Sequence, residues 1–442
     1  MPAQLILPID IAKITFTRAI LLVLFFPALF SYIRGLGNGT RHIQLPDILV
    51  VFMCFWILGA FTATEGIAVS AESGGLVVLE FLGGYLIMRG FVRTRQDVET
   101  YVLWLAVAIL LLVLIALFDS LVGRNLVTES IARLTGERTI DNQYRNGLLR
   151  ARAMLEHPIL FGTLCAFAAV ILFYGLRTVK LRFAGLALCT FGVVLTVSSA
   201  PLLALLIAFG IMAYDRIFRG VPGRWRLLIG VIAAALLLLT IISDHPVRAL
   251  INRLTFDAQT AYVRLLIWEY AGADALNSPW VGIGREDWAR PLWMPPSIDT
   301  IWLVLAVVYG IPCSLLLGGA LLASMRNTAP KVPESLLDPY LVRMRRALSI
   351  VLCLAIVIGF TVHFWGVMWT FLGILIGLRT TLGDMVAAEA AALMSGRRAG
   401  ARVLPYGTLR ARCDPIGSGF RYQNPRRSSG RNGSTGYRRP YF

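Results

Sequence analysis

The sequence predicts an all-α polytopic integral membrane protein, and two observations carry that prediction. Of the 442 residues, 57% are hydrophobic and only 15% are charged, and the mean hydropathy is +0.70. Soluble proteins carry about 25% charged residues, so much of this surface must face lipid. In addition, apolar runs of about 20 residues, the length that crosses a bilayer, recur along the chain. The composition therefore excludes a water-soluble globule.

The apolar runs predict about eleven transmembrane helices, within a range of 10 to 12. The separate runs lie at residues 14–33, 48–69, 74–92, 99–118, 158–175, 183–199, 200–214, 226–243 and 300–325. The stretch 347–378 has room for two short spans, which we expect to turn at His363-Phe364-Trp365-Gly366. Two hydrophilic segments interrupt this pattern and are too long to be hairpin turns.

These runs and interruptions divide the chain into six parts. They are N-terminal transmembrane helices (1–118), a first long loop (119–157), central transmembrane helices (158–243), a second long loop (244–299), C-terminal transmembrane helices (300–380) and a basic tail (381–442). The tail is rich in Arg, Gly, Ser and Pro and lacks an apolar period, so we expect it to be disordered.

Basic residues predict the orientation in the membrane. The net charge is +17, and short loops collect it at Arg177, Lys180, Arg182, Arg216, Arg219, Arg224, Arg226, Arg343, Arg345 and Arg346. By the positive-inside rule this side is cytoplasmic, which places the tail inside and both long loops in a periplasm. We expect a multi-pass protein of a bacterial inner membrane. The tail then lies against anionic membrane lipid, and we expect no nucleic-acid partner.

The sequence offers no recognisable cofactor or metal site. The six cysteines are scattered singly, without the paired spacing of a zinc site or a disulfide framework. The long loops also lack an Asp-x-Asp element. We therefore expect no cofactor and no metal.

The long loops contain arginine and acidic residues but no lysine, and each ends beside a span. Charged groups at a membrane edge suit an anionic ligand attached to a lipid, such as a polyprenyl diphosphate, which arginine can bind through two hydrogen bonds. Arg150 lies at the entrance to a span and Arg264 begins an amphipathic run, so we interpret both as ligand-binding. Three other arginines are interpreted as solvated, namely Arg124, Arg133 and Arg138.

Four motifs follow one another along the central part of the chain. The first is RARAMLEHPILFG, with Arg150, Leu155, His157, Pro158 and Gly162 in place, although Ala153 stands where the pattern has glycine. The others are the break Ser198-Ser199-Ala200-Pro201, the segment with Arg264, Trp268, Pro279, Gly282, Ile283 and Gly284, and the span close Gly310-Ile311-Pro312. From 150 to 312 the chain resembles the O-antigen ligase and O-antigen (exopolysaccharide) polymerase superfamily.

The resemblance implies a metal-independent membrane glycosyltransferase whose donor is a glycan linked to undecaprenyl diphosphate, working on the periplasmic face. The expected reaction is polymerisation of exopolysaccharide or O-antigen repeat units. Alternatives are a ligase-type transfer to another acceptor and a transporter or flippase of the lipid-linked unit. A flippase would place charges between two similar halves, and no internal repeat is visible. Expected protein partners are a chain-length regulator and a repeat-unit flippase.

The resemblance also implies a set of site residues. The donor is expected on Arg150, Arg152, His157, Arg264, Arg285 and Arg290. Ligases of the superfamily carry a catalytic histidine near the position of Asp299, and its replacement by aspartate favours a polymerase. A carboxylate with an ordinary pKa of about 4 is a weak base unless desolvation raises that pKa. Asp299 could equally be the N-cap of the next helix. Glu80, inside a span, is expected to pair with an arginine such as Arg89.

Overall fold

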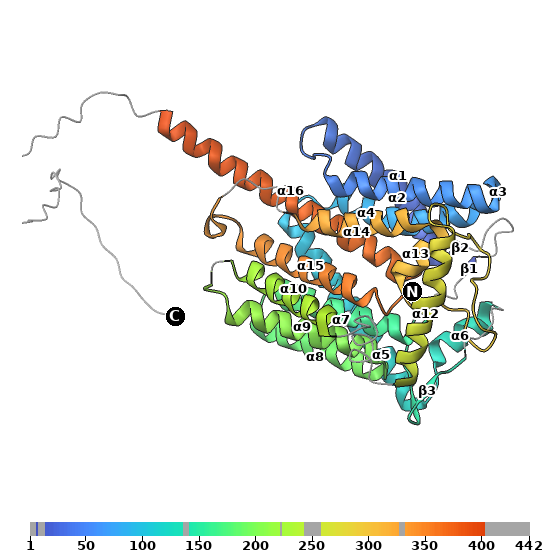
Figure 1. Cartoon of the computed structure of the whole chain (residues 1–442). Coiled ribbons are helices and arrows are strands. Elements are labelled where there is room, and N and C mark those ends of the chain that lie inside the picture. Colours follow the sequence, from blue (N-terminus) through green and yellow to red (C-terminus); the bar gives the residue numbers. More distant parts are fainter. Residues whose placement is uncertain are drawn as a thin grey trace, which may run out of the picture. The chain divides into compact units, whose positions relative to one another are not determined.

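The computed structural model describes residues 6–7, 14–135, 141–221, 223–242, 258–326 and 332–402, and it confirms an all-α polytopic membrane protein (Figure 1). The chain divides into two units, 1–395 and 396–442, and the eight apolar helical segments described below lie in the first up to residue 395. Within the described residues, strands form only two short antiparallel pairs. These are β1 (Ile6–Leu7) with β2 (Ile14–Thr15), and β3 (Tyr144–Arg145) with β4 (Leu148–Leu149).

Eight helical segments of the described chain are long and apolar enough to cross a membrane. They are α1 (Phe16–Gly37), α2 (Leu45–Glu65), the run from α3 (Ile67–Val69) through a π-helical turn (Ser70–Gly74) to α4 (Gly75–Phe91), α5 (Arg95–Val122), α7 (Pro158–Gly175), α9 (Ser199–Ile217), α10 (Arg224–Ile242) and α16 (Val367–Arg402).

Three shorter or more charged helical segments complete the bundle. They are α8 (Val179–Leu195), α15 (Pro339–Ile358) and the broken pair α13 (Ile301–Tyr309) and α14 (Ile311–Met325). With the eight others they account for the eleven segments expected from the apolar runs. The late apolar stretch forms α15 and α16, and residues 359–366, which include the expected turn, connect them. Helix α16 continues past the predicted tail boundary at 380, and residues 403–442 lie outside the described part.

The break between α13 and α14 explains the glycine pattern of the second long loop. Gly310 has φ +87°, and a Cβ there would run into the main-chain carbonyl of Trp280. Main-chain hydrogen bonds join the second long loop to this break: Ile283 N donates to Val307 O at 2.7 Å, and Ile311 N donates to Pro279 O at 2.8 Å. The second long loop is therefore attached directly to α13 and to the start of α14.

Buried ion pairs link α4 to α2, α16 and α1. Arg89 is fully buried on α4 and binds Asp47 of α2 at 2.8 Å and Asp384 of α16 at 2.5 Å. The expectation that Glu80 pairs with an arginine is confirmed, but Arg89 is the wrong partner, since Glu80 pairs with Arg18 of α1 at 2.8 Å. Glu80 and Arg89 lie nine residues apart, which places them on different turns of α4 and beside different neighbours.

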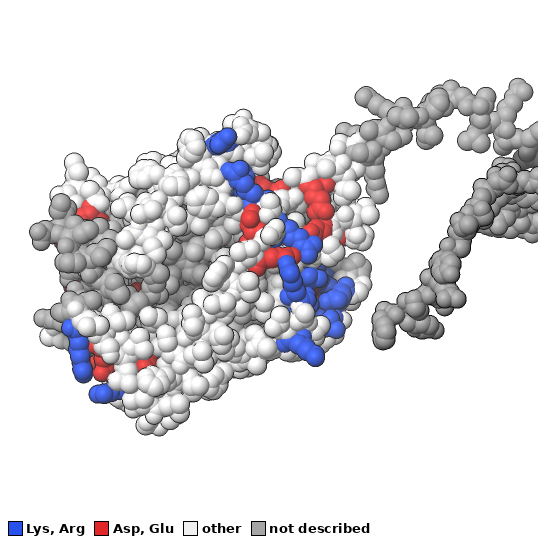
Figure 2. All heavy atoms as spheres, turned by 180° about the vertical axis from the view of Figure 1, so that it is seen from behind, with Lys and Arg blue, Asp and Glu red and all other residues white. Residues whose placement is uncertain are grey.

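The bundle of the first unit has two chemically different ends. The loop end comprises α6 (Leu126–Thr135), the β3–β4 hairpin, α12 (Ala258–Asn277), residues 278–299 and residues 359–366, and α12 runs across the direction of the other long helices (Figure 1). Lys and Arg gather at the other end, the arginine end, as Figure 2 shows. Its ion pairs include Arg95 and Arg177 with Glu99, and Arg345 with Glu334.

Candidate functional site

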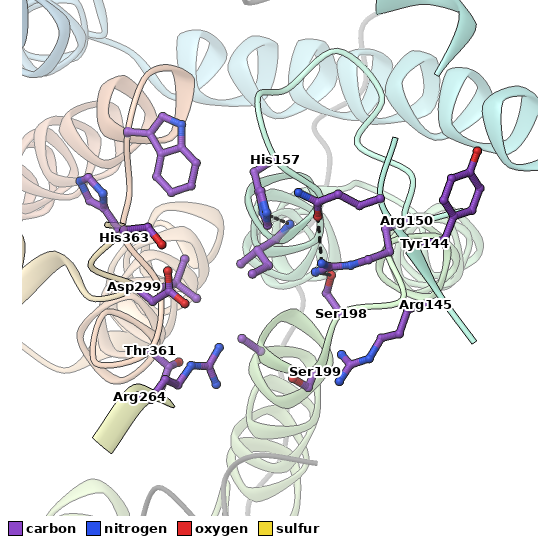
Figure 3. A pocket seen from close by; sticks show the side chains of 16 residues that line it. Tyr144, Arg145, Arg150, His157, Ser198, Ser199, Arg264, Asp299, Thr361 and His363 are labelled. Atoms are coloured by element: carbon purple, nitrogen blue, oxygen red, sulfur yellow. Dashed lines mark hydrogen bonds between the residues drawn. The ribbon is translucent and has the colours of Figure 1, made fainter. Parts of the chain in front are cut away.

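A cavity of about 660 Å³ opens at the loop end and collects residues from five separate segments of the chain. Among them are Arg150, His157, Arg264 and Asp299, which the sequence placed in two different loops (Figure 3). The full lining is Gln143, Tyr144, Arg145, Arg150, His157, Ile159, Ser198, Ser199, Ala200, Arg264, Ser297, Asp299, Thr361, Val362, His363 and Trp365.

Arg150 is held by neutral groups on one wall of the cavity. Its guanidinium donates to Gln143 Oε1 and to Ser198 Oγ, both at 2.9 Å, and its main-chain N–H donates to Gln143 O. Burial lowers its pKa, and Arg145 lowers it further. Helix α9 starts beside it at Ser199, so the partial positive charge of a helix N-terminus adds to the guanidinium. This wall favours an anion.

Arg264 lies deeper, on α12, with only 6% of its surface exposed. Its Nε atom is buried without a hydrogen-bond partner, and in the described part of the chain its guanidinium forms no hydrogen bond and no ion pair. Burial lowers its pKa, which Asp299 raises and Arg145 lowers further. One helical turn along α12, Trp268 stacks on Phe360 with ring centroids 5.8 Å apart, which fixes the helix at the cavity.

Asp299 lines the cavity immediately before α13. The helix-capping interpretation is not what the structure shows, because Thr300 is the N-cap residue and Asp299 makes no hydrogen bond to any residue the structure describes. Burial raises the pKa of its carboxyl group, and the positive charge of Arg264 opposes that rise. A carboxylate of raised pKa is a better proton acceptor than an ordinary aspartate.

Two histidines also line the cavity. His157 is the N-cap of α7, and its Nδ1 atom accepts a hydrogen bond from Ile159 N at 3.2 Å. A neutral His157 therefore carries its proton on Nε2. His363 comes from residues 359–366, and burial lowers the pKa of each histidine to about 4. Both are consequently neutral at pH 7, and Trp365 lies beside them at centroid distances of 6.0 Å and 5.2 Å.

Three of the arginines expected at the site lie outside the cavity lining. Arg152 is buried and donates to Thr128 Oγ1 at 3.1 Å. The side chain of Arg285 donates to Ser73 Oγ, and Arg290 pairs with Asp287. Arg152 and Arg290 are engaged within their own loops, and Arg285 ties the second loop to the π-helical turn before α4. The structure therefore does not bring these three side chains to the cavity.

Of the arginines interpreted as solvated, Arg124 and Arg133 are exposed, as expected. Arg138 lies outside the described residues.

Sequence reasoning missed Arg145, His363 and Trp365 as lining residues. A signal for Arg145 existed, because the dipeptide Asn146-Gly147 is typical of a two-residue hairpin turn. Asn146 and Gly147 do have φ values of +51° and +76°, and the hairpin presents Arg145 at the cavity. His363 and Trp365 belong to a turn that was expected, but nothing local indicated which loops it would meet.

Within the described residues, no group of three His, Cys, Asp or Glu side chains is arranged to hold a metal ion. Comparison of the chain with models of known protein families and with curated proteins finds no match. The chemistry of this cavity is therefore the basis on which a function can be inferred.

Proposed function

We propose that the chain is a membrane glycosyltransferase that takes a glycan from a polyprenyl diphosphate, and that the cavity at the loop end binds the diphosphate. The observation that carries the proposal is Arg264, a buried guanidinium without an ion pair among the described residues. Burying an uncompensated charge costs several kcal/mol. An anionic ligand removes that cost when it binds, so Arg264 favours such a ligand strongly.

The charge of the cavity supports an anionic ligand. In its described lining, two arginines stand with the one carboxylate of Asp299: Arg150, which neutral groups hold, and Arg264, which forms no ion pair with a described residue. The neutral histidines leave this balance unchanged at pH 7. Guanidinium groups match phosphate oxygens in pairs of parallel hydrogen bonds, so a diphosphate fits this wall in both charge and geometry.

The position of the cavity supports a ligand attached to a lipid. Its lining residues lie at the starts of α7 and α9 and just before α13 and α16, all of which are ends of bundle helices. Helix ends in a bundle of this length lie near the headgroup region of a bilayer. A polyprenyl diphosphate would place its charged group there while its chain stays in the hydrocarbon. We propose further that the loop end faces the periplasm of a bacterial inner membrane.

The same residues can divide the chemistry of transfer between them. A hydroxyl oxygen of the acceptor sugar forms a bond to the anomeric carbon of the donor glycan, while the bond from that carbon to the diphosphate oxygen breaks. The hydroxyl proton passes to the Asp299 carboxylate. The leaving diphosphate gains negative charge, which the arginines are placed to stabilise. The products are a longer glycan and a polyprenyl diphosphate.

Polymerisation of lipid-linked repeat units is our first proposal, and ligase-type transfer to a different acceptor is the second. The sequence has no histidine near Asp299, where ligases of the superfamily carry one, and this favoured a polymerase. In the folded chain, however, His157 and His363 line the same cavity as Asp299. The absence of a nearby histidine in the sequence therefore does not distinguish a polymerase from a ligase. Only the identity of the acceptor distinguishes them.

The proposal is tested with purified protein in lipid nanodiscs and lipid-linked oligosaccharide extracted from cells in which this gene is deleted. The wild-type protein should lengthen the glycan and release undecaprenyl diphosphate, both visible by mass spectrometry. Arg133→Ala, at an exposed position of α6, should match the wild type. Wild-type protein that binds the lipid fraction but converts none of it would contradict the proposal.

A further inference from the structure

Residues 359–366, the turn between α15 and α16, form a rigid wall of the cavity beside Asp299. The main-chain N–H of Ile301 donates to Gly359 O at 3.1 Å and to Val362 O at 3.2 Å. The Thr300 hydroxyl donates to Gly359 O at 2.8 Å. Because Thr300 and Ile301 directly follow Asp299, these bonds fix the turn and the carboxylate relative to each other.

The far end of the turn is fixed against the entrance of α7. Gly366 has φ +54°, and a Cβ there would collide with the carboxyl group of Glu156, which therefore packs on the glycine backbone. Stacking of Trp268 on Phe360 holds the turn from the side of α12. Three separate segments thus determine where the side chains of the turn lie, as a preorganised binding wall requires.

The cavity face of this wall is aromatic and neutral. Trp365 lies between His157 and His363, at ring-centroid distances of 6.0 Å and 5.2 Å, and all three line the cavity. Among the described residues, neither the indole N–H of Trp365 nor either nitrogen of His363 has a hydrogen-bond partner. The wall therefore combines apolar ring surface with unused hydrogen-bonding groups.

The arginines face the turn from two directions. In Figure 3, His363 and Asp299 lie on one side of the cavity and Arg145 and Arg150 lie on the other, while Arg264 lies near Asp299. Guanidinium groups suit the diphosphate. Ring surface with neutral polar groups suits an uncharged polyhydroxylated ligand, whose C–H faces pack on aromatic rings while its hydroxyls bond the polar edge.

We propose that Trp365 and His363 bind the sugar ring of the acceptor and present its hydroxyl to Asp299. The inference rests on the proposed function and deepens it, because it assigns the acceptor to the 359–366 turn and leaves the donor to the arginines. It makes the 359–366 turn the element that selects the acceptor, while the arginines select the donor.

The test measures the two substrates separately in Trp365→Ala, Trp365→Phe and His363→Gln. The acceptor is the repeat-unit oligosaccharide released from its lipid by mild acid, varied against a fixed lipid-linked donor. The donor probe is undecaprenyl diphosphate, whose Kd is measured by direct binding. Trp365→Ala should raise the acceptor KM about tenfold, as expected for removal of a packed aromatic contact, and leave the probe Kd within about twofold. Trp365→Phe should recover part of the loss.

Trp293→Ala is the matched control, since this tryptophan is 64% exposed in the same group of outer loops and does not line the cavity. An unchanged acceptor KM in both Trp365 variants would overturn the inference. So would a probe Kd that weakens as much as the acceptor KM, because the wall would then belong to the donor. Failure of the proposed function looks different, as the wild type itself would then form no product. Trp365→Phe and His363→Gln keep the test valid if Trp365→Ala fails to fold.

Discussion

Arg264 and Asp299 line the same cavity and attract each other, yet no ion pair or hydrogen bond joins them in the part of the chain that the structure describes. A closed ion pair would occupy the donors of the arginine and hold the pKa of the aspartate low. Without it, the guanidinium keeps its donors for an incoming anion and the carboxylate stays able to accept a proton. The separation of these two groups is the basis of the predictions on activity.

Replacement of Arg264 should reduce the rate of glycan transfer strongly. Losing a contact that strengthens as the diphosphate departs should cost about 3 kcal/mol, or on the order of a hundredfold in rate. Arg264→Lys should fail almost as badly as Arg264→Ala, because lysine keeps the charge but loses the planar fork. Initial rates with lipid-linked oligosaccharide decide this. A fully active Arg264→Ala would remove this residue from the donor site.

The pH dependence of transfer should report the raised pKa of Asp299. A base works only when deprotonated, so activity should rise with pH through the pKa of this carboxyl group. Because burial raises that pKa above its ordinary value of 3.8, the acidic limb of kcat/KM should lie at higher pH than an ordinary aspartate would give. In Asp299→Asn the remaining activity should be low and should lack this limb. An identical acidic limb in the variant would assign the titration to another group.

His157 should make the protein less stable in mild acid. Its pKa is about 4 in the folded chain and 6.5 in the unfolded chain, so between these values the unfolded chain binds more protons and stability falls as the pH falls. His157→Asn removes the titration but keeps a good N-cap residue for α7. Thermal unfolding should match the wild type at pH 7 and show a smaller decrease at pH 5. Equal decreases in both proteins would refute the assignment.

The network around Arg89 should be needed for folding rather than for chemistry. Arg89→Met leaves Asp47 buried without its guanidinium partner and leaves Asp384 with only Arg41, at 4.0 Å, which should destabilise the protein by about 3 to 5 kcal/mol. Arg95→Met breaks only ion pairs of a half-exposed arginine and should cost less than about 1 kcal/mol. Thermal unfolding of the two variants in detergent provides the comparison. Equal stability of both would show that the buried network contributes little.

Much of the fold could be predicted from apolar run lengths, because a bilayer requires segments of nearly fixed length. The eleven segments and the turn before α16 follow from that constraint alone. The sequence did not indicate that α16 continues to Arg402, since an amphipathic extension past the membrane lacks the apolar signal.

The site could be predicted only in part, because it is assembled from loops that are distant in the sequence. Arg150 was predicted because it precedes a span, and Arg264 because it begins an amphipathic run, although α12 itself starts earlier, at Ala258. Arg152, only two residues from Arg150, points to Thr128 instead. The turn that carries His363 is held beside Asp299 by main-chain hydrogen bonds from Ile301 to Gly359 and Val362. Main-chain bonds do not depend on side-chain identity, so the sequence could not indicate them.

The most direct test of the central claim is the binding of undecaprenyl diphosphate to the purified protein in nanodiscs. The wild type and Arg133→Ala should bind it with the same Kd, and Arg264→Ala and Arg150→Ala should each weaken binding by about tenfold or more. Undecaprenol, which lacks the diphosphate, should not compete. Binding that is equally strong in all four proteins, or that undecaprenol displaces, would contradict a diphosphate site in this cavity.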